Sequence, residues 1–165
     1  MLKRIINAVR RNHALEHATI SVLLSRHGPH TRVLGRAAPD GFYIYGDVPT
    51  DRLKEFAHEG LARLQRGESH LAVSPLCGTN LAVAGLLAGL ASYSAIACRN
   101  NRLDSLPGAL MAAMLAVLAA QPLGRLVQKR FTTLAEVDGV RIVSVDLLGG
   151  RLPGVHKVRT ESSMV

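Results

Sequence analysis

The sequence lacks several features on which whole classes of protein depend. It has no tryptophan, two cysteines and 4% aromatic residues among 165 positions. Two cysteines cannot build the disulfide framework of a small secreted scaffold. So few aromatic rings offer little surface for stacking nucleobases, and no nucleic-acid-binding module is recognisable, so we expect no nucleic-acid partner. Apolar residues, by contrast, make up 48% of the chain, which excludes an intrinsically disordered protein.

Charge is absent from two long stretches. No charged residue lies within Leu71–Cys98 or within Ser105–Gly124. The apolar part of the first stretch, Leu81–Cys98, and the whole second stretch are each long enough to cross a hydrocarbon core as a helix. Two such runs predict a transmembrane hairpin, and the alternative is a pair of buried helices in a soluble core. Gly85 and Gly89 form a small-xxx-small step, at which we expect the second helix to approach closely.

The distribution of lysine and arginine predicts an orientation for this hairpin. Of the 20 basic residues, eleven precede the first stretch, two lie between the stretches and seven follow the second. The positive-inside rule then places both termini in the cytoplasm and the hairpin in the inner (plasma) membrane. Arg125, Lys129 and Arg130 would contact anionic headgroups. Cys77 and Cys98 lie at opposite ends of the first span, about 30 Å apart, and cannot pair within one chain.

The remaining segments predict a small α+β domain. Leu2–Ser25 has helical periodicity with Ala18 opposite its apolar face, and a second helix begins at Thr50 or Asp51 and runs to about Arg66. Alternating or β-branched runs predict strands at Thr31–Arg36, Phe42–Asp47, Leu71–Ser74, Gly139–Leu147 and Val155–Thr160. The first two strands flank Ala-Pro-Asp-Gly and form a hairpin.

These elements give an α+β fold interrupted by the membrane hairpin. We expect an N-terminal cytoplasmic part over residues 1–76, a transmembrane hairpin over 77–124, and a C-terminal cytoplasmic β part over 125–165 that packs on the N-terminal part. In the second helix of the hairpin, Pro107 is expected in the first turn and Pro122 at the end. We expect His27, His30 and His156 to be solvated.

The segment His13-Ala-Leu-Glu16-His17 carries the clearest chemical pattern. Its H-x-x-E-H spacing is locally similar to the inverzincin metallopeptidases. Residues i and i+4 are neighbours on a helix, so both imidazoles could bind one ion, and the carboxylate between them could act as general base toward metal-bound water. The alternative is a hydrogen-bonded polar cluster, because ionisable groups on an apolar face must be paired, neutralised or metal-bound.

An open zinc site requires a third protein ligand. Glu68, His70 and Cys77 are the candidates, because they lie on the approach to the first apolar stretch and could fold back over the first helix. His58 and Glu59 fall away from the apolar face of their own helix, which counts against them.

The chain also resembles a family of uncharacterised small bacterial integral membrane proteins, known mainly from photosynthetic and related lineages. The shared pattern covers most of residues 12–130 and consists of the His-x-x-Glu-His helix, a Gly-Phe hairpin, an Arg-Leu-x-x-Gly-Glu helix end and a Cys-Gly-Thr-Asn step. The resemblance implies this architecture and favours Glu68 and Cys77 as partners of the histidine helix. Where the family pattern has a histidine this chain has Ser74, and His70 is the candidate substitute.

Two functions of different class are therefore expected. The first is a membrane-anchored metal-binding protein, with zinc or another divalent transition metal on His13 and His17, and with Glu16 as the base of a peptidase-type hydrolase. The second is a non-catalytic accessory subunit or assembly factor of a larger bacterial membrane complex, or a homo-oligomer, that packs through Gly85 and Gly89. Its histidine cluster would then be structural or would ligate a pigment or haem.

Overall fold

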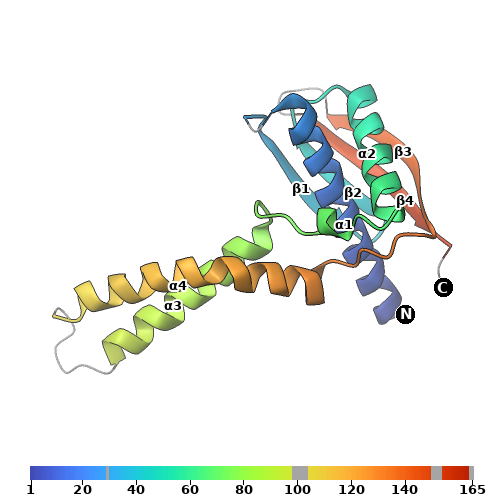
Figure 1. Ribbon diagram of the computed structural model, residues 1–165. Coiled ribbons are helices and arrows are strands. Elements are labelled where there is room, and N and C mark those ends of the chain that lie inside the picture. Colours follow the sequence, from blue (N-terminus) through green and yellow to red (C-terminus); the bar gives the residue numbers. More distant parts are fainter. Residues whose placement is uncertain (29, 98–103, 150–153, 164–165) are drawn as a thin grey trace. The chain divides into compact units, whose positions relative to one another are not determined.

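The computed structural model describes residues 1–28, 30–97, 104–149 and 154–163, and the chain forms two compact units (Figure 1). One unit consists of Met1–Ser74 together with Lys129–Val165, and is called the α+β unit here. The other, Pro75–Gln128, is called the helical unit. The predicted loop residues Arg99 and Arg102, the second cysteine, Cys98, and the predicted helix stop at Pro29 lie outside the described residues.

The α+β unit contains two helices and a four-stranded antiparallel sheet, whereas the sequence predicts two helices and five strands. Its described elements are α1 (Leu2–His27), β1 (Val33–Ala38), β2 (Gly41–Gly46), α2 (Thr50–Gln65), the 3₁₀ turn η1 (Ser69–Ala72), β3 (Val140–Gly149) and β4 (Val155–Ser162). The strand order is β1-β2-β4-β3, so β4 lies between β3, the strand before it in the sequence, and β2, which is far from it in the sequence. The predicted strand at Leu71–Ser74 is wrong, because η1 occupies its start and the segment pairs with no described strand.

One face of the sheet is covered by α1 and α2 (Figure 1). Residues on alternate positions of β2 point into this layer, and Phe42 and Ile44 are completely buried there. Val158 of β4, which pairs with Phe42, is also completely buried. The core therefore lies between the two helices and the middle strands. Every second residue of these strands points into it.

The middle of α1 is buried on the side that the helical periodicity predicts to face solvent as well as on its apolar side. Ala18, expected on the solvent side, is completely buried, whereas the apolar Leu2 and Ile6 at the start of the helix are 72% and 49% exposed. The reason is close packing against α2: a Cβ on Gly60 would come within 3.0 Å of the Thr19 nitrogen. Only a residue without a side chain allows two helix backbones to approach this closely.

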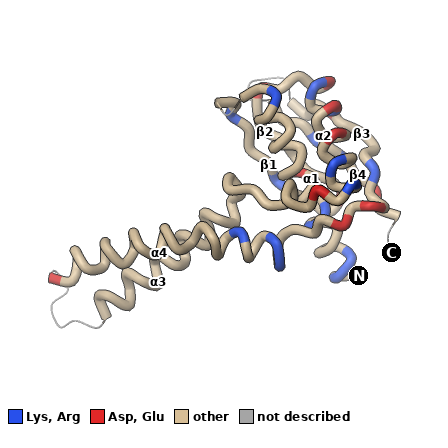
Figure 2. Tube along the Cα trace, in the orientation of Figure 1, with Lys and Arg blue, Asp and Glu red and all other residues tan. Residues whose placement is uncertain are grey.

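The helical unit is an antiparallel pair formed by α3 (Gly78–Ala97) and α4 (Leu106–Val127), which continues as the π-helical turn η2 (Gln128–Thr132). Both helices are long and apolar enough to cross a membrane by length and composition. Figure 2 shows charge confined to the ends of this pair. Pro107 lies in the first turn of α4 as predicted, but Pro122 lies inside the helix and does not end it.

The close approach of the two helices is not at the predicted step. Added Cβ atoms on Gly85 and Gly89 would meet nothing within 4 Å, whereas one on Gly124 would come 3.2 Å from the Cα of Asn80. The Asn80 amide fills this space: its Oδ1 accepts a hydrogen bond from Gln128 Nε2 at 2.8 Å, and its Nδ2 donates to the Pro75 carbonyl at 2.9 Å. An amide pair, rather than a glycine step, therefore joins α3 to α4.

Candidate metal centre

The two histidines of the H-x-x-E-H segment stand side by side on α1. They are one helical turn apart, and their ring centroids are separated by 4.4 Å with the rings tilted by 59°. His17 is 3% exposed and His13 is half-buried. The predicted helical presentation of both imidazoles on one face is confirmed.

Each histidine makes the same kind of hydrogen bond through its Nδ1 atom. His13 Nδ1 lies 2.9 Å from the Thr132 carbonyl oxygen, and His17 Nδ1 lies 2.8 Å from the Ala72 carbonyl oxygen. A carbonyl can only accept, so Nδ1 carries the proton in both rings. In the neutral imidazole this leaves Nε2 unprotonated, with its lone pair directed away from the carbonyl. Histidines that ligate metals are held in this tautomer by the same kind of partner.

The Nε2 atom of His17, on the other side of the ring from Nδ1, gives an independent indication of a ligand. His17 Nε2 is buried and makes no hydrogen bond to any described residue. A buried ring nitrogen without a partner costs about 1–3 kcal/mol of stability. Such an atom is available to bind a further group, and the neutral imidazole nitrogen is the commonest metal ligand among side chains.

Glu16 lies on the same turn of α1 and faces β1. It is 5% exposed, and a Cβ on Gly35 would come 2.6 Å from the Glu16 Cγ atom. The carboxylate thus occupies space that Gly35 leaves open in the strand. This contact explains a glycine in the middle of β1, where a side chain would displace the glutamate.

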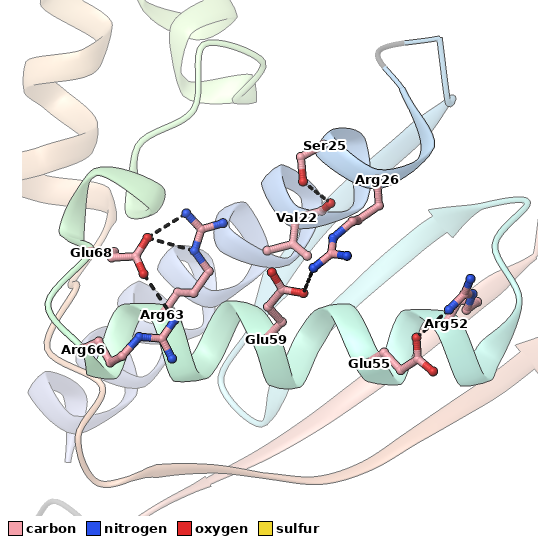
Figure 3. A network of polar contacts seen from close by, with 9 residues as sticks. All are labelled: Val22, Ser25, Arg26, Arg52, Glu55, Glu59, Arg63, Arg66 and Glu68. Carbon is pink, nitrogen blue, oxygen red and sulfur yellow. Dashed lines mark hydrogen bonds and ion pairs between the residues drawn. The ribbon is translucent and has the colours of Figure 1, made fainter.

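Glu68 is engaged by two arginines at the end of α2 (Figure 3). Arg63 donates from Nε and Nη2 to one Glu68 oxygen at 2.8 and 2.7 Å, and Arg66 donates to the other at 3.3 Å. The hydrogen bond from Arg63 is the main cause that lowers the pKa of Glu68 below its ordinary value. Both carboxylate oxygens are therefore occupied by guanidinium groups.

The local backbone explains why Glu68 folds back. Gly67 has φ +90°, and its N–H donates to Leu64 O while the Glu68 N–H donates to Arg63 O. This is the Schellman ending of a helix, for which glycine is preferred. The pattern Arg-Leu-x-x-Gly-Glu is thus a helix end, as the resemblance implies, and the sequence did not reveal the ion pair that closes it.

His70 and Cys77 complete the predicted candidates. His70 lies exposed in η1. Cys77 directly precedes α3 in the helical unit, and its Sγ accepts a hydrogen bond from the Thr79 N–H at 3.4 Å. It follows Ala72, the residue whose carbonyl holds His17, by five positions in the chain. Five residues span at most about 17 Å, so the Cα atoms of Ala72 and Cys77 lie no farther apart than that.

Sequence reasoning missed a second role of the histidines. His17 binds the chain just before the helical unit, at Ala72, and His13 binds the chain just after it, at Thr132. Arg10 adds bonds to the Arg130 and Thr133 carbonyls at 2.9 and 3.1 Å. Side chains on three turns of α1 thus hold both connections to the hairpin. No sequence signal indicates this, because the acceptors are backbone carbonyls.

His156 was also misjudged. It is 2% exposed rather than solvated, and its Nε2 lies 3.1 Å from Thr50 Oγ1 at the start of α2. Burial lowers its pKa below the ordinary value.

Comparison with known proteins gives a family without an assigned activity. Residues 8–145 match the family model described as Domain of unknown function (DUF6391). An uncharacterised protein of Picosynechococcus sp. is 37% identical over 134 residues, which is 76% of this chain and 65% of that protein. The chain therefore spans about two thirds of the length of this relative. No solved structure matches this chain.

Proposed function

Since the chain belongs to the DUF6391 family, a domain of unknown function, its role has to be argued from its own residues, and we propose that it is a membrane-anchored metal-binding protein. The observation that carries the proposal is the buried His17 Nε2 without a hydrogen-bond partner among the described residues, beside a second imidazole in the same tautomer. The nitrogen donors favour zinc or another divalent transition metal.

Cys77 is the third ligand in this proposal. Imidazole and thiolate are the usual donors of zinc sites, and Cys77 follows Ala72, whose carbonyl holds His17, by five positions in the chain. The engagement of Glu68 by arginines and the exposure of His70 make these two residues weaker candidates. A bound ion would supply Lewis-acid activation of water. Glu16 would then serve as the base of a peptidase-type hydrolase, which is the finer form of the proposal.

The membrane part of the proposal is supported by the helical unit. Its helices present large side chains outward, for example Leu86, Leu90 and Leu118 at 64%, 56% and 71% exposure. The excess of lysine and arginine on both flanks favours the inner membrane with both termini in the cytoplasm.

The decisive experiment is metal analysis of untagged protein purified in detergent. We choose His13→Asn/His17→Asn, because an asparagine amide can still donate to the Thr132 and Ala72 carbonyls but offers no Nε2 lone pair. About one zinc or iron per chain is expected in the wild type and less than a tenth of that in the variant. His58→Asn is the matched control, since His58 Nδ1 makes the same kind of bond to the Lys54 carbonyl at 2.8 Å on an exposed surface.

Two further variants separate the parts of the proposal. Cys77→Ser should lower metal occupancy if the thiolate is a ligand, and unchanged occupancy removes Cys77 from the site. Glu16→Gln should retain the metal and abolish hydrolysis of a casein or peptide-library substrate. Wild-type protein that holds no metal after incubation with zinc would refute the proposal.

The second candidate function, an accessory subunit or assembly factor, is favoured by the carbonyl bonds of His13 and His17. These bonds alone would hold the connections to the hairpin. In that case the Asn variants keep full stability and the protein contains no metal. The open Gly85 and Gly89 positions would then be the surface for a partner or a second copy.

A further inference from the structure

The first turns of α1 leave an apolar face uncovered within the α+β unit. Leu2, Ile5 and Ile6 are 72%, 42% and 49% exposed, and Val9 is half-buried. At about 100° per residue, these four side chains fall on one face of the helix. The cavity between this half of α1 and the sheet is lined, on the helix, by Lys3, Arg4, Asn7, Ala8, Arg11 and Asn12. The cationic and amide side chains therefore lie toward the sheet, and the apolar face points away from it.

This apolar face lies on the side of α1 that holds the chain after α4. Val9 and His13 are one turn apart on the same face of the helix, and His13 Nδ1 donates to the Thr132 carbonyl at 2.9 Å. Thr132 is the last residue of η2, the turn that continues α4. Phe131, which precedes it, is 71% exposed. The exposed apolar residues of α1 therefore share a side of the helix with the point at which the chain leaves an apolar helix.

Exposed cations accompany the apolar face. Lys3 on α1 and both Lys129 and Arg130 on η2 are exposed, and no acidic residue precedes Glu16 in the sequence. Anionic headgroups attract basic side chains that lie at a membrane surface. A second copy of the chain on the same face would instead bring these cations together, which is opposed by their repulsion. Charge therefore favours a lipid surface over a homodimer as the occupant of this face.

We propose that the first turns of α1 lie on the surface of an anionic bilayer, with Leu2, Ile5 and Ile6 in the boundary between headgroups and acyl chains. Surface helices bury their apolar face about 5–10 Å into this boundary. The inference rests on the membrane part of the proposed function, because a membrane-crossing α4 brings η2 to the same boundary. The α+β unit thereby makes a membrane contact of its own, and the helix that carries His13 and His17 is held at the bilayer surface.

The test uses the absence of tryptophan from the sequence. Ile5→Trp and Ile6→Trp are made separately in the full chain, which is placed in nanodiscs of phosphatidylglycerol with brominated acyl chains. Bromine quenches tryptophan only at short range, so both variants should lose about half of their emission relative to unbrominated nanodiscs. Leu34→Trp is the matched control, because Leu34 is an apolar side chain on β1 that is 66% exposed, and its emission should be unchanged. Leu118→Trp, on α4, reports whether the hairpin itself lies in the bilayer.

Quenching of Ile5→Trp and Ile6→Trp without quenching of Leu34→Trp supports the proposal, as does weaker quenching in brominated phosphatidylcholine, which has no net charge. Quenching of Leu118→Trp alone overturns the proposal and leaves the membrane part of the proposed function intact. If no position is quenched, that membrane part is refuted as well. A shift of the Ile6→Trp emission to shorter wavelength without quenching would mean that protein covers this face, and equal quenching of Leu34→Trp would mean that the contact is not specific to α1; either result overturns the proposal.

Discussion

Replacement of Gly35 by alanine tests whether Glu16 is held where the structure places it. The new Cβ would lie 2.6 Å from the Glu16 Cγ, and ordinary carbon contacts are about 3.5–4.0 Å, so the glutamate must move by roughly 1 Å. Glu16 is 5% exposed and has little room. An off-rotamer side chain costs about 0.5–1.5 kcal/mol and a disturbed buried polar group about 1–3 kcal/mol.

The intrinsic preference of a strand for alanine over glycine opposes this destabilisation. Its contribution to the free energy of unfolding is small and can be measured separately. Alanine is favoured over glycine in a strand by about 0.5–1 kcal/mol, and Gly35 has no positive φ that would prevent the substitution. We therefore expect Gly35→Ala to destabilise the wild type by about 1–3 kcal/mol. In a Glu16→Ala background the methyl group enters vacated space, and the same change should stabilise by about 0.5 kcal/mol.

The assay is denaturant unfolding of the full chain in detergent, followed by tyrosine fluorescence. The protein has three tyrosines and no tryptophan, and Tyr43 and Tyr45 lie on β2 beside β1. Tyr93→Phe removes the signal from the helical unit and confines the measurement to the sheet. Equal effects of Gly35→Ala in both backgrounds would refute the proposed contact and, with it, the position of Glu16.

Three other outcomes are expected. His156 is buried and its pKa is lowered from 6.5, so the unfolded chain binds a proton at a higher pH than the folded chain does. The free energy of unfolding should therefore fall as pH drops below about 6.5. His156→Gln should reduce the dependence of the free energy of unfolding on pH in titrations between about pH 5 and 8. Gly124→Leu would force α4 away from Asn80 and should cost about 1–3 kcal/mol, seen as a lower thermal midpoint by circular dichroism in detergent; an unchanged midpoint contradicts the tight helix contact. Phe42→Ala should cost about 3–5 kcal/mol in the fluorescence assay, because Phe42 is completely buried, and a loss below 1 kcal/mol would mean that the core is wrongly placed.

The sequence by itself determined the helices and the four sheet strands of this protein, although it wrongly predicted a further strand at Leu71–Ser74. Hydrophobic periodicity predicted α1 and α2 within a few residues, β-type runs predicted both strand pairs, and two uncharged stretches predicted the helices of the helical unit. The i, i+4 spacing of His13 and His17 was sufficient to place both rings on one face, because it follows from helix geometry alone.

Only the tertiary structure decided what surrounds these side chains. The partners of His13 and His17 are carbonyls 119 and 55 residues away, and no local pattern encodes a backbone acceptor. The burial of Ala18 depends on Gly60, a residue of another helix. A cavity whose lining includes Arg4, Arg11 and Thr160 forms because the sheet brings the end of β4 beside the start of α1. Periodicity describes one element at a time, whereas these features arise where distant elements meet.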